Sequence, residues 1–140
     1  MFAKTADRIA DIRARAEAAT PGHWGVHYDG KGTYTIEAQP RLILGVGNVR
    51  EGVVATLHGE HGDAQPYRDS GFMARAREDV PFLLDRVAEL EALVKDLTDP
   101  DPCHFDHHGY CQAHGWFATD PVCPHGRAQT LFPELKDGAE

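Results

Sequence analysis

The chain has 140 residues, of which 41% are hydrophobic, and a formal net charge of −8 at pH 7. This apolar content suffices for a folded core and excludes a disordered polypeptide. No apolar run approaches the roughly 20 residues that a membrane-spanning helix needs. The first residues also lack the hydrophobic centre of a signal peptide. We therefore expect a cytoplasmic protein.

The negative charge is concentrated in the second half of the chain. Residues 1–62 carry seven acidic and seven basic side chains, residues 63–102 carry ten and five, and residues 103–140 carry five and two. No segment offers the basic face that binding to nucleic-acid phosphates requires. Direct binding of nucleic acid is therefore disfavoured. An acidic decoy that occupies a nucleic-acid-binding protein is an alternative that this charge leaves open.

The pattern of apolar residues predicts a helix over residues 3–19, followed by short strands. In the helix, apolar residues recur at steps of three and four from Ile9 to Ala19, and Pro21 ends it. Two segments with alternating apolar residues, 24–28 and 34–38, flank a turn and favour a hairpin. Two further apolar runs lie beyond it, at 42–44 and 53–57. An antiparallel meander of three or four strands is expected.

Helical periodicity then returns and predicts a C-terminal helix pair. A short helix begins near Asp69, and a longer one spans about 80–98 with Pro81 in its first turn. Apolar residues of the second helix recur at steps of four and three: Leu83, Val87, Leu90, Val94 and Leu97. This stripe has two interpretations. It packs on the chain's own core, or it forms the seam of a two-stranded parallel homodimer.

Prolines at 100 and 102 divide the chain after this helix, because they favour an extended backbone that ends a helix. We predict an α+β body over residues 1–98 and a hinge over 99–102. A Cys/His metal-binding module follows over 103–133, and a frayed tail over 134–140.

All three cysteines lie among histidines in the last quarter of the chain. Thiolate and imidazole groups suit zinc better than any hard cation. Gly115 follows a Cys-x2-His pair and permits the tight turn of a zinc knuckle. The predicted ligands, spaced x7, x2 and x8, are Cys103, Cys111, His114 and Cys123, with His125 as a substitute. The other interpretation is of buried thiols and surface histidines without a metal.

A structural role is expected for this zinc, because a module of about 38 residues with few aliphatic side chains usually needs a cross-link, such as a metal ion or a disulfide, to fold. We expect a non-enzymatic interaction or regulatory protein that binds a host or regulatory protein. Zinc would hold Trp116 and Phe117 on a contact surface, unless both aromatic rings form the module's own core. A metal-dependent hydrolase or nuclease with an open, three-ligand site is an alternative.

Two segments resemble a known group of proteins. Residues 15–24, RAEAATPGHW, resemble the AATPGPW opening of many small proteins encoded by actinobacteria and their phages. Residues 69–84, DSGFMARAREDVPFLL, look like the DAEFIAxARxDVPxLL phrase of the same proteins. The chain departs from these phrases at His23, Ser70 and Gly71. The resemblance implies an accessory, phage-related cytoplasmic protein, and it transfers no catalytic residue.

Overall fold

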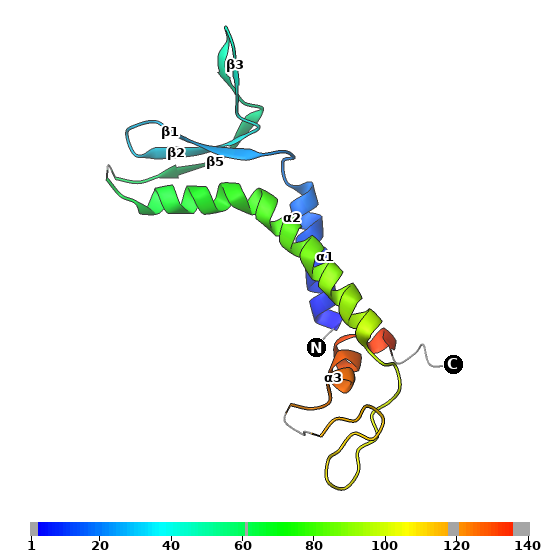
Figure 1. Cartoon of the computed structure of the whole chain (residues 1–140). Helices are drawn as coiled ribbons and strands as arrows, with labels where there is room; N and C mark the ends of the chain where they lie inside the picture. Colours follow the sequence, from blue (N-terminus) through cyan, green and yellow to red (C-terminus); the bar gives the residue numbers. More distant parts are fainter. Residues whose placement is uncertain (1–2, 61, 118–120, 136–140) are drawn as a thin grey trace. The chain divides into compact units, whose positions relative to one another are not determined.

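The computed structural model describes residues 3–60, 62–117 and 121–135 and has the expected α+β class (Figure 1). The chain groups into two compact units. The sheet unit is Asp7–Asp85, and the C-terminal unit is Met1–Ala6 with Arg86–Glu140. The sequence instead places its boundary at 99–102. Of the predicted tail, Glu134 and Leu135 belong to the 3-10 helix η1 (Pro133–Leu135), and residues 136–140 lie outside the described ones.

Helix α1 spans Ala3–Ala18, in agreement with its apolar periodicity. Its C-terminal end is fixed by side chains from two later elements. The guanidinium of Arg77 donates to the carbonyls of Ala16 (3.2 Å) and Thr20 (2.9 Å), and Trp24 Nε1 donates to the Thr20 carbonyl (3.0 Å). A cation is favourable here because the last carbonyls of a helix lack intrahelical partners and carry its negative end.

An antiparallel three-stranded sheet follows, with the strand order β1-β2-β5. Asp29 closes the predicted β1–β2 turn, because its carboxylate accepts hydrogen bonds from the backbone amides of Thr33 and Lys31. These bonds hold the pKa of Asp29 below its ordinary value. Tyr28 and Tyr34 lie opposite each other and stack at 4.5 Å. The strands are β1 (Trp24–Tyr28), β2 (Thr33–Ala38) and β5 (Gly52–His58).

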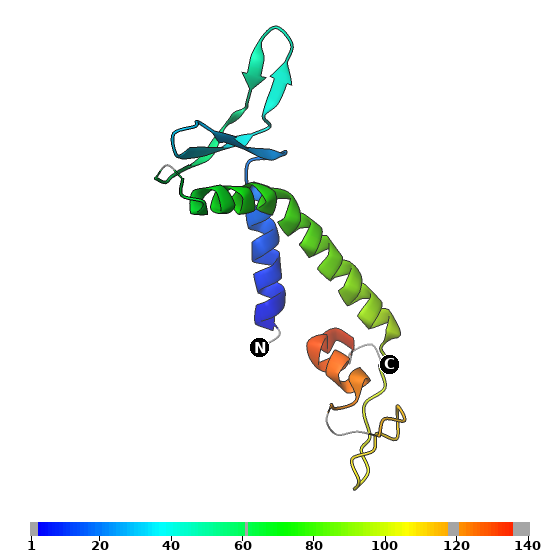
Figure 2. The same ribbon diagram turned by 60° about the vertical axis from the view of Figure 1, so that its left-hand side comes forward.

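The predicted strand at 42–44 does not join this sheet. Strand β3 (Arg41–Ile43) pairs with β4 (Gly47–Val49), which the sequence indicated only as a turn, in a separate two-stranded sheet (Figure 2). Gly45 and Gly47 have φ angles of +82° and +99°, so the chain reverses at once instead of returning to the sheet. Leu42 is 71% exposed, and the hairpin therefore depends on strand pairing rather than on burial.

The predicted helix pair is a single helix, α2, of 33 residues over Gln65–Leu97. Pro81 lies inside it rather than at a helix start. Proline lacks one N–H donor, but its fixed φ is helical, and the residues around it are mostly strong helix formers such as alanine, leucine, arginine and glutamate. The helix therefore continues through Pro81. None of the described helices is both long and apolar enough to cross a membrane.

The interior of the sheet unit lies between the sheet and the first half of α2 (Figures 1 and 2). Ile36 and Ala38 of β2 are 0% and 1% exposed. Buried small residues recur on α2 at steps of four: Pro66, Ser70 and Ala74. They let the strand backbone approach the helix closely. The buried Ser70 hydroxyl donates to the Tyr67 carbonyl at 2.9 Å, so its burial leaves no unpaired donor.

Candidate metal centre

The first ligand pair is held by a tight loop over residues 111–116, which we call the knuckle loop. Cys111 and Trp116 exchange backbone hydrogen bonds across it, at 2.8 and 3.2 Å. Gly115 has a φ of +64°, which agrees with the expectation that a glycine is needed for the turn to close. The loop therefore brings the side chains of Cys111 and His114 to the same side.

Cys103 reaches the knuckle loop through the segment before it. The Gln112 amide donates to the His104 carbonyl at 2.7 Å, and Phe105 forms a bridge with Cys111. Between these contacts the carboxylate of Asp106 accepts two backbone N–H groups and closes the turn at 106–110. This local network places Cys103 next to a cysteine that lies eight positions later.

The third cysteine stands at the start of a helix that the sequence did not predict. Cys123 precedes α3 (Pro124–Leu131), although the Pro-His-Gly that follows it has the composition of a turn. A helix begins here because proline's fixed φ suits the first turn of a helix. Gly126 is required for packing, since a Cβ at this position would lie 2.8 Å from Cys103 Sγ.

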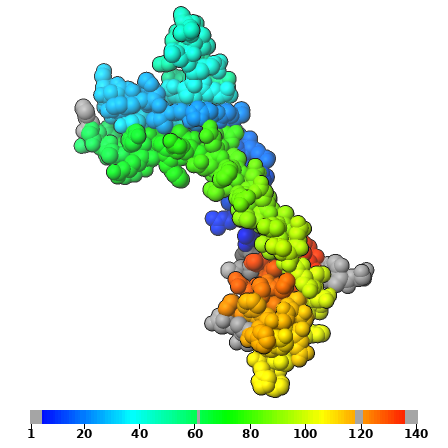
Figure 3. All heavy atoms as spheres, in the orientation of Figure 1, coloured from blue at the N-terminus to red at the C-terminus, as the bar shows by residue number. Residues whose placement is uncertain are grey.

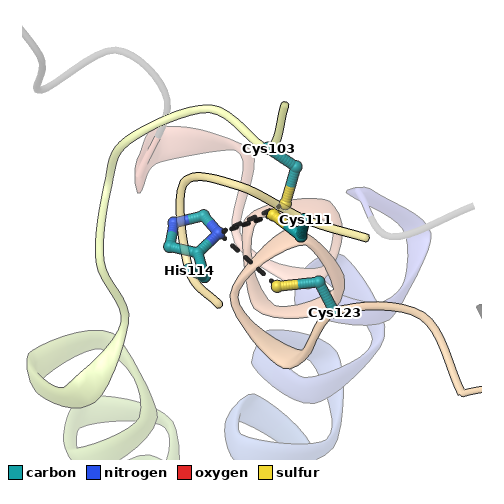
Figure 4. Close-up of side chains that lie close together, drawn as sticks. All are labelled: Cys103, Cys111, His114 and Cys123. Atoms are coloured by element: carbon teal, nitrogen blue, oxygen red, sulfur yellow. Dashed lines mark hydrogen bonds between the residues drawn. The ribbon is translucent and has the colours of Figure 1, made fainter. Parts of the chain in front are cut away.

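The structure brings together the four ligands that the spacing predicted. One ligand atom from each of Cys103, Cys111, His114 and Cys123 lies within 4.8 Å of the others. His114 Nδ1 is 3.5, 3.4 and 3.5 Å from the three Sγ atoms, in that chain order (Figure 4). A tetrahedral zinc with Zn–S of about 2.3 Å and Zn–N of about 2.0–2.1 Å has N···S edges of about 3.5 Å. The donor atoms therefore already have the spacing of such a shell.

The cluster is closed to solvent on most sides. Cys111 and Cys123 are fully buried, the His114 side chain is 1% exposed, and Cys103 is partly exposed. His114 Nε2 is buried without a hydrogen-bond partner, and a carboxylate oxygen of Asp99 lies 4.0 Å from it. If a metal occupies Nδ1, Nε2 carries the ring proton, and Asp99 is the nearby acceptor that can orient the ring.

His125, the predicted substitute ligand, has a different place. Its Nδ1 accepts the Asp99 amide at 2.9 Å, and its ring stacks on that of His114 at 4.5 Å. The buried Gln129 donates to the carbonyls of Asp99 and Asp101, at 3.0 and 2.8 Å. The predicted hinge is thus bound to α3. His104, His107 and His108 are exposed, as expected for residues that are not ligands.

Two of the cysteines have pKa values that are shifted in opposite directions. Burial raises the pKa of Cys103 to about 12, assisted by its hydrogen bonds with Cys111 and Cys123. Burial alone would also raise the pKa of Cys111, but hydrogen bonds from the backbone and ring of His114 and from Cys103 outweigh it and lower the pKa to about 7. If all three cysteines bind as thiolates, so dry a place would require a strong positive charge, which a divalent metal would supply.

The two predicted contact residues differ in exposure. Trp116 is half-buried, and its Nε1 donates to the Pro121 carbonyl at 3.0 Å. Phe117 is 85% exposed, with its ring 4.5 Å from that of Tyr110. A cavity of about 580 Å³ also opens beside the cluster, lined by Cys103, Phe105, Val122 and the two hinge prolines among others. Trp116 is therefore partly structural, whereas Phe117 is available at the surface.

In comparisons with known proteins, no family model, no curated protein and no solved structure matches this chain. The proposed function therefore depends on the residues of this chain alone.

Proposed function

We propose that Cys103, Cys111, His114 and Cys123 bind one zinc ion whose role is structural. The observation that carries this proposal is the set of three Sγ atoms at 3.4–3.5 Å from one imidazole nitrogen, in a site largely shielded from solvent. Four protein ligands complete a tetrahedral shell and leave no position for an activated water. The hydrolase or nuclease alternative, which needs an open position, is for this reason not favoured.

The burial of side chains in the C-terminal unit supports a structural role. Its fully buried cysteines, Cys111 and Cys123, belong to the cluster, whereas Phe105 and Leu131 are each 49% exposed. Apolar burial is therefore too small to order residues 103–131 on its own. A structural zinc contributes on the order of 10–16 kcal/mol in small domains, which is enough to replace a hydrophobic core.

The function that we propose for the whole chain is protein–protein interaction. Phe117 and the cavity beside Cys103 offer apolar surface on a segment that zinc would hold rigid, which is the form that contact residues commonly take. The partner would be a host or regulatory protein, in keeping with the resemblance to accessory, phage-related cytoplasmic proteins. No observation on the described residues favours the acidic decoy.

A second copy of the chain is a further partner that we propose. The apolar residues predicted as a homodimer seam are between 37% and 70% exposed: Leu83, Val87, Leu90, Val94 and Leu97. Single exposed apolar residues are ordinary on protein surfaces, but a continuous stripe at helical spacing marks an interaction face.

Metal analysis of the purified full chain tests the zinc proposal. We expect one zinc per chain and loss of that zinc in Cys111→Ser, with collapse of the amide resonances of residues 103–131 in NMR spectra. His104→Ala is the matched control, because His104 is an exposed histidine of the same segment and should change neither result. A metal-free chain with well-dispersed resonances for residues 103–131 would contradict the proposal.

A further inference from the structure

The five residues of the stripe on α2, which we call the α2 seam, have the pattern of a particular kind of coiled coil. Val87 and Val94 occupy one position of a heptad, and Leu83, Leu90 and Leu97 occupy the other. Valine at a and leucine at d favour two parallel strands over other assemblies. The second half of α2 lies at the molecular surface on the side shown in Figure 3, coloured yellow-green.

The charges that flank the seam agree with the same arrangement. In this heptad Arg86 is a g residue and Glu91 is the e residue of the next heptad. In a parallel pair, each g residue faces the following e residue of the second helix. Arg86 of one copy therefore faces Glu91 of the other copy, and the two-fold symmetry forms this attractive contact twice. Antiparallel pairing would not bring these two positions together.

Arg86 can leave its partner within the chain and pair with Glu91 of a second copy at little cost. Within one chain it contacts Glu89, one turn away, at 2.7 Å, and both side chains are more than half exposed. Exposed pairs of this kind contribute little to stability. Two further ion pairs involve this part of the helix: Asp85 with Arg13 at 3.1 Å, and Lys95 with Glu134 at 2.6 Å. Lys95 also lies over the Phe132 ring. Lys95 is at a b position, outside the seam.

We propose that two copies of the chain pair in parallel through the α2 seam and that Arg86 and Glu91 set this orientation. The inference rests on the self-association proposed above. In each copy the Cys/His module follows the seam within a few residues, so parallel pairing brings two modules to the same end of the coiled coil. The assembly would then present two contact surfaces side by side to one partner, which raises its avidity.

Charge reversal tests the orientation, with sedimentation equilibrium of the full chain as the measurement. Arg86→Glu and Glu91→Arg should each weaken the dimer at least about tenfold, because each makes both cross-pairs repulsive. An equimolar mixture of the two variants should restore wild-type affinity as a heterodimer, because both of its cross-pairs join opposite charges. Arg75→Glu is the control, since it makes the same charge change on an exposed residue of α2 outside the seam.

The outcomes separate the two levels of the proposal. A wild-type chain that stays monomeric at several hundred micromolar overturns self-association itself. A wild-type dimer that single reversals weaken no more than Arg75→Glu does overturns the parallel pairing and leaves self-association standing. Leu90→Lys should abolish the dimer in either orientation, and a dimer that survives this change is not formed by the seam.

Discussion

The two units of this chain differ in the kinds of side chain that they bury. The sheet unit buries the apolar side chains of Ile36, Ala38 and Ala74. Pairing of the strands and packing of α2 on the sheet bring them together. The C-terminal unit buries two thiols and an imidazole, together with Ala128 and Gln129, and leaves most of its aromatic rings partly exposed. With the proposed zinc bound, the C-terminal unit would owe its order to one set of strong bonds, where the sheet unit relies on many weak contacts.

This difference determines how each unit responds to damage. Loss of one apolar contact removes a part of the sheet unit's stability, in proportion to the volume lost. Loss of one ligand would remove the whole contribution of the metal, because the remaining donors no longer complete the shell. The following changes test whether the two interiors behave in this separate way, and they are ordered by expected effect.

Ile36→Ala should have the largest effect on the sheet unit. The side chain is fully buried on β2, so its truncation is expected to cost about 2–5 kcal/mol of unfolding free energy. Urea denaturation followed by the fluorescence of Trp24, in a Trp116→Phe background, measures the change. Val53→Ala, at a side chain that is 51% exposed on β5, is the control and should cost less than about 1 kcal/mol. A parallel fall in zinc affinity would show that the two interiors are coupled.

Asp99→Asn should lower zinc affinity by about 10–100-fold, the usual effect of losing the acceptor behind a ligand histidine. The substitution keeps the amide that hydrogen-bonds to His125 and removes the charge next to His114 Nε2. Competition with a chromogenic chelator measures the affinity. Asp101→Asn changes the same charge in the same segment and should have little effect. Equal zinc affinities of the two variants would show that Asp99 does not support the site.

Gly71→Ala should have the smallest effect, and it should be stabilising. The residue lies inside α2 with open space where a Cβ would stand, so alanine is expected to add about 0.5–1 kcal/mol. Gly45→Ala should have the opposite sign, because the β3–β4 turn holds Gly45 at a φ of +82°. Thermal unfolding of both variants checks the pair. A loss of stability in Gly71→Ala would indicate a contact on this face of α2.

Local sequence patterns predicted which residues form the candidate metal site. They did not predict contacts between residues that are distant in sequence. Ligand types, short spacings and the glycine of the knuckle loop are local features, and they placed Cys103, Cys111, His114 and Cys123 correctly in one cluster. The positions of Asp99 and His125 depend on contacts 26–30 residues apart, made with a helix whose apolar pattern is weak. A signal existed in Pro124, which is typical of a helix start.

Propensity rules gave the wrong result where two of them competed. Proline predicted a break at Pro81, but the surrounding helix formers continued α2 through it. The glycines after Ile43 are typical turn residues, and their turn is tight enough to form a hairpin of its own. In both cases the neighbouring residues decided the outcome.

The two segments 15–24 and 69–84 meet at a single carbonyl group. Thr20 belongs to the first segment, and its oxygen accepts hydrogen bonds from Trp24 of that segment and from Arg77 of the second. His23 of the first segment pairs with Glu78 of the second, at 2.7 Å. In any chain that carries both segments, an acidic residue at 78 should therefore accompany histidine at 23.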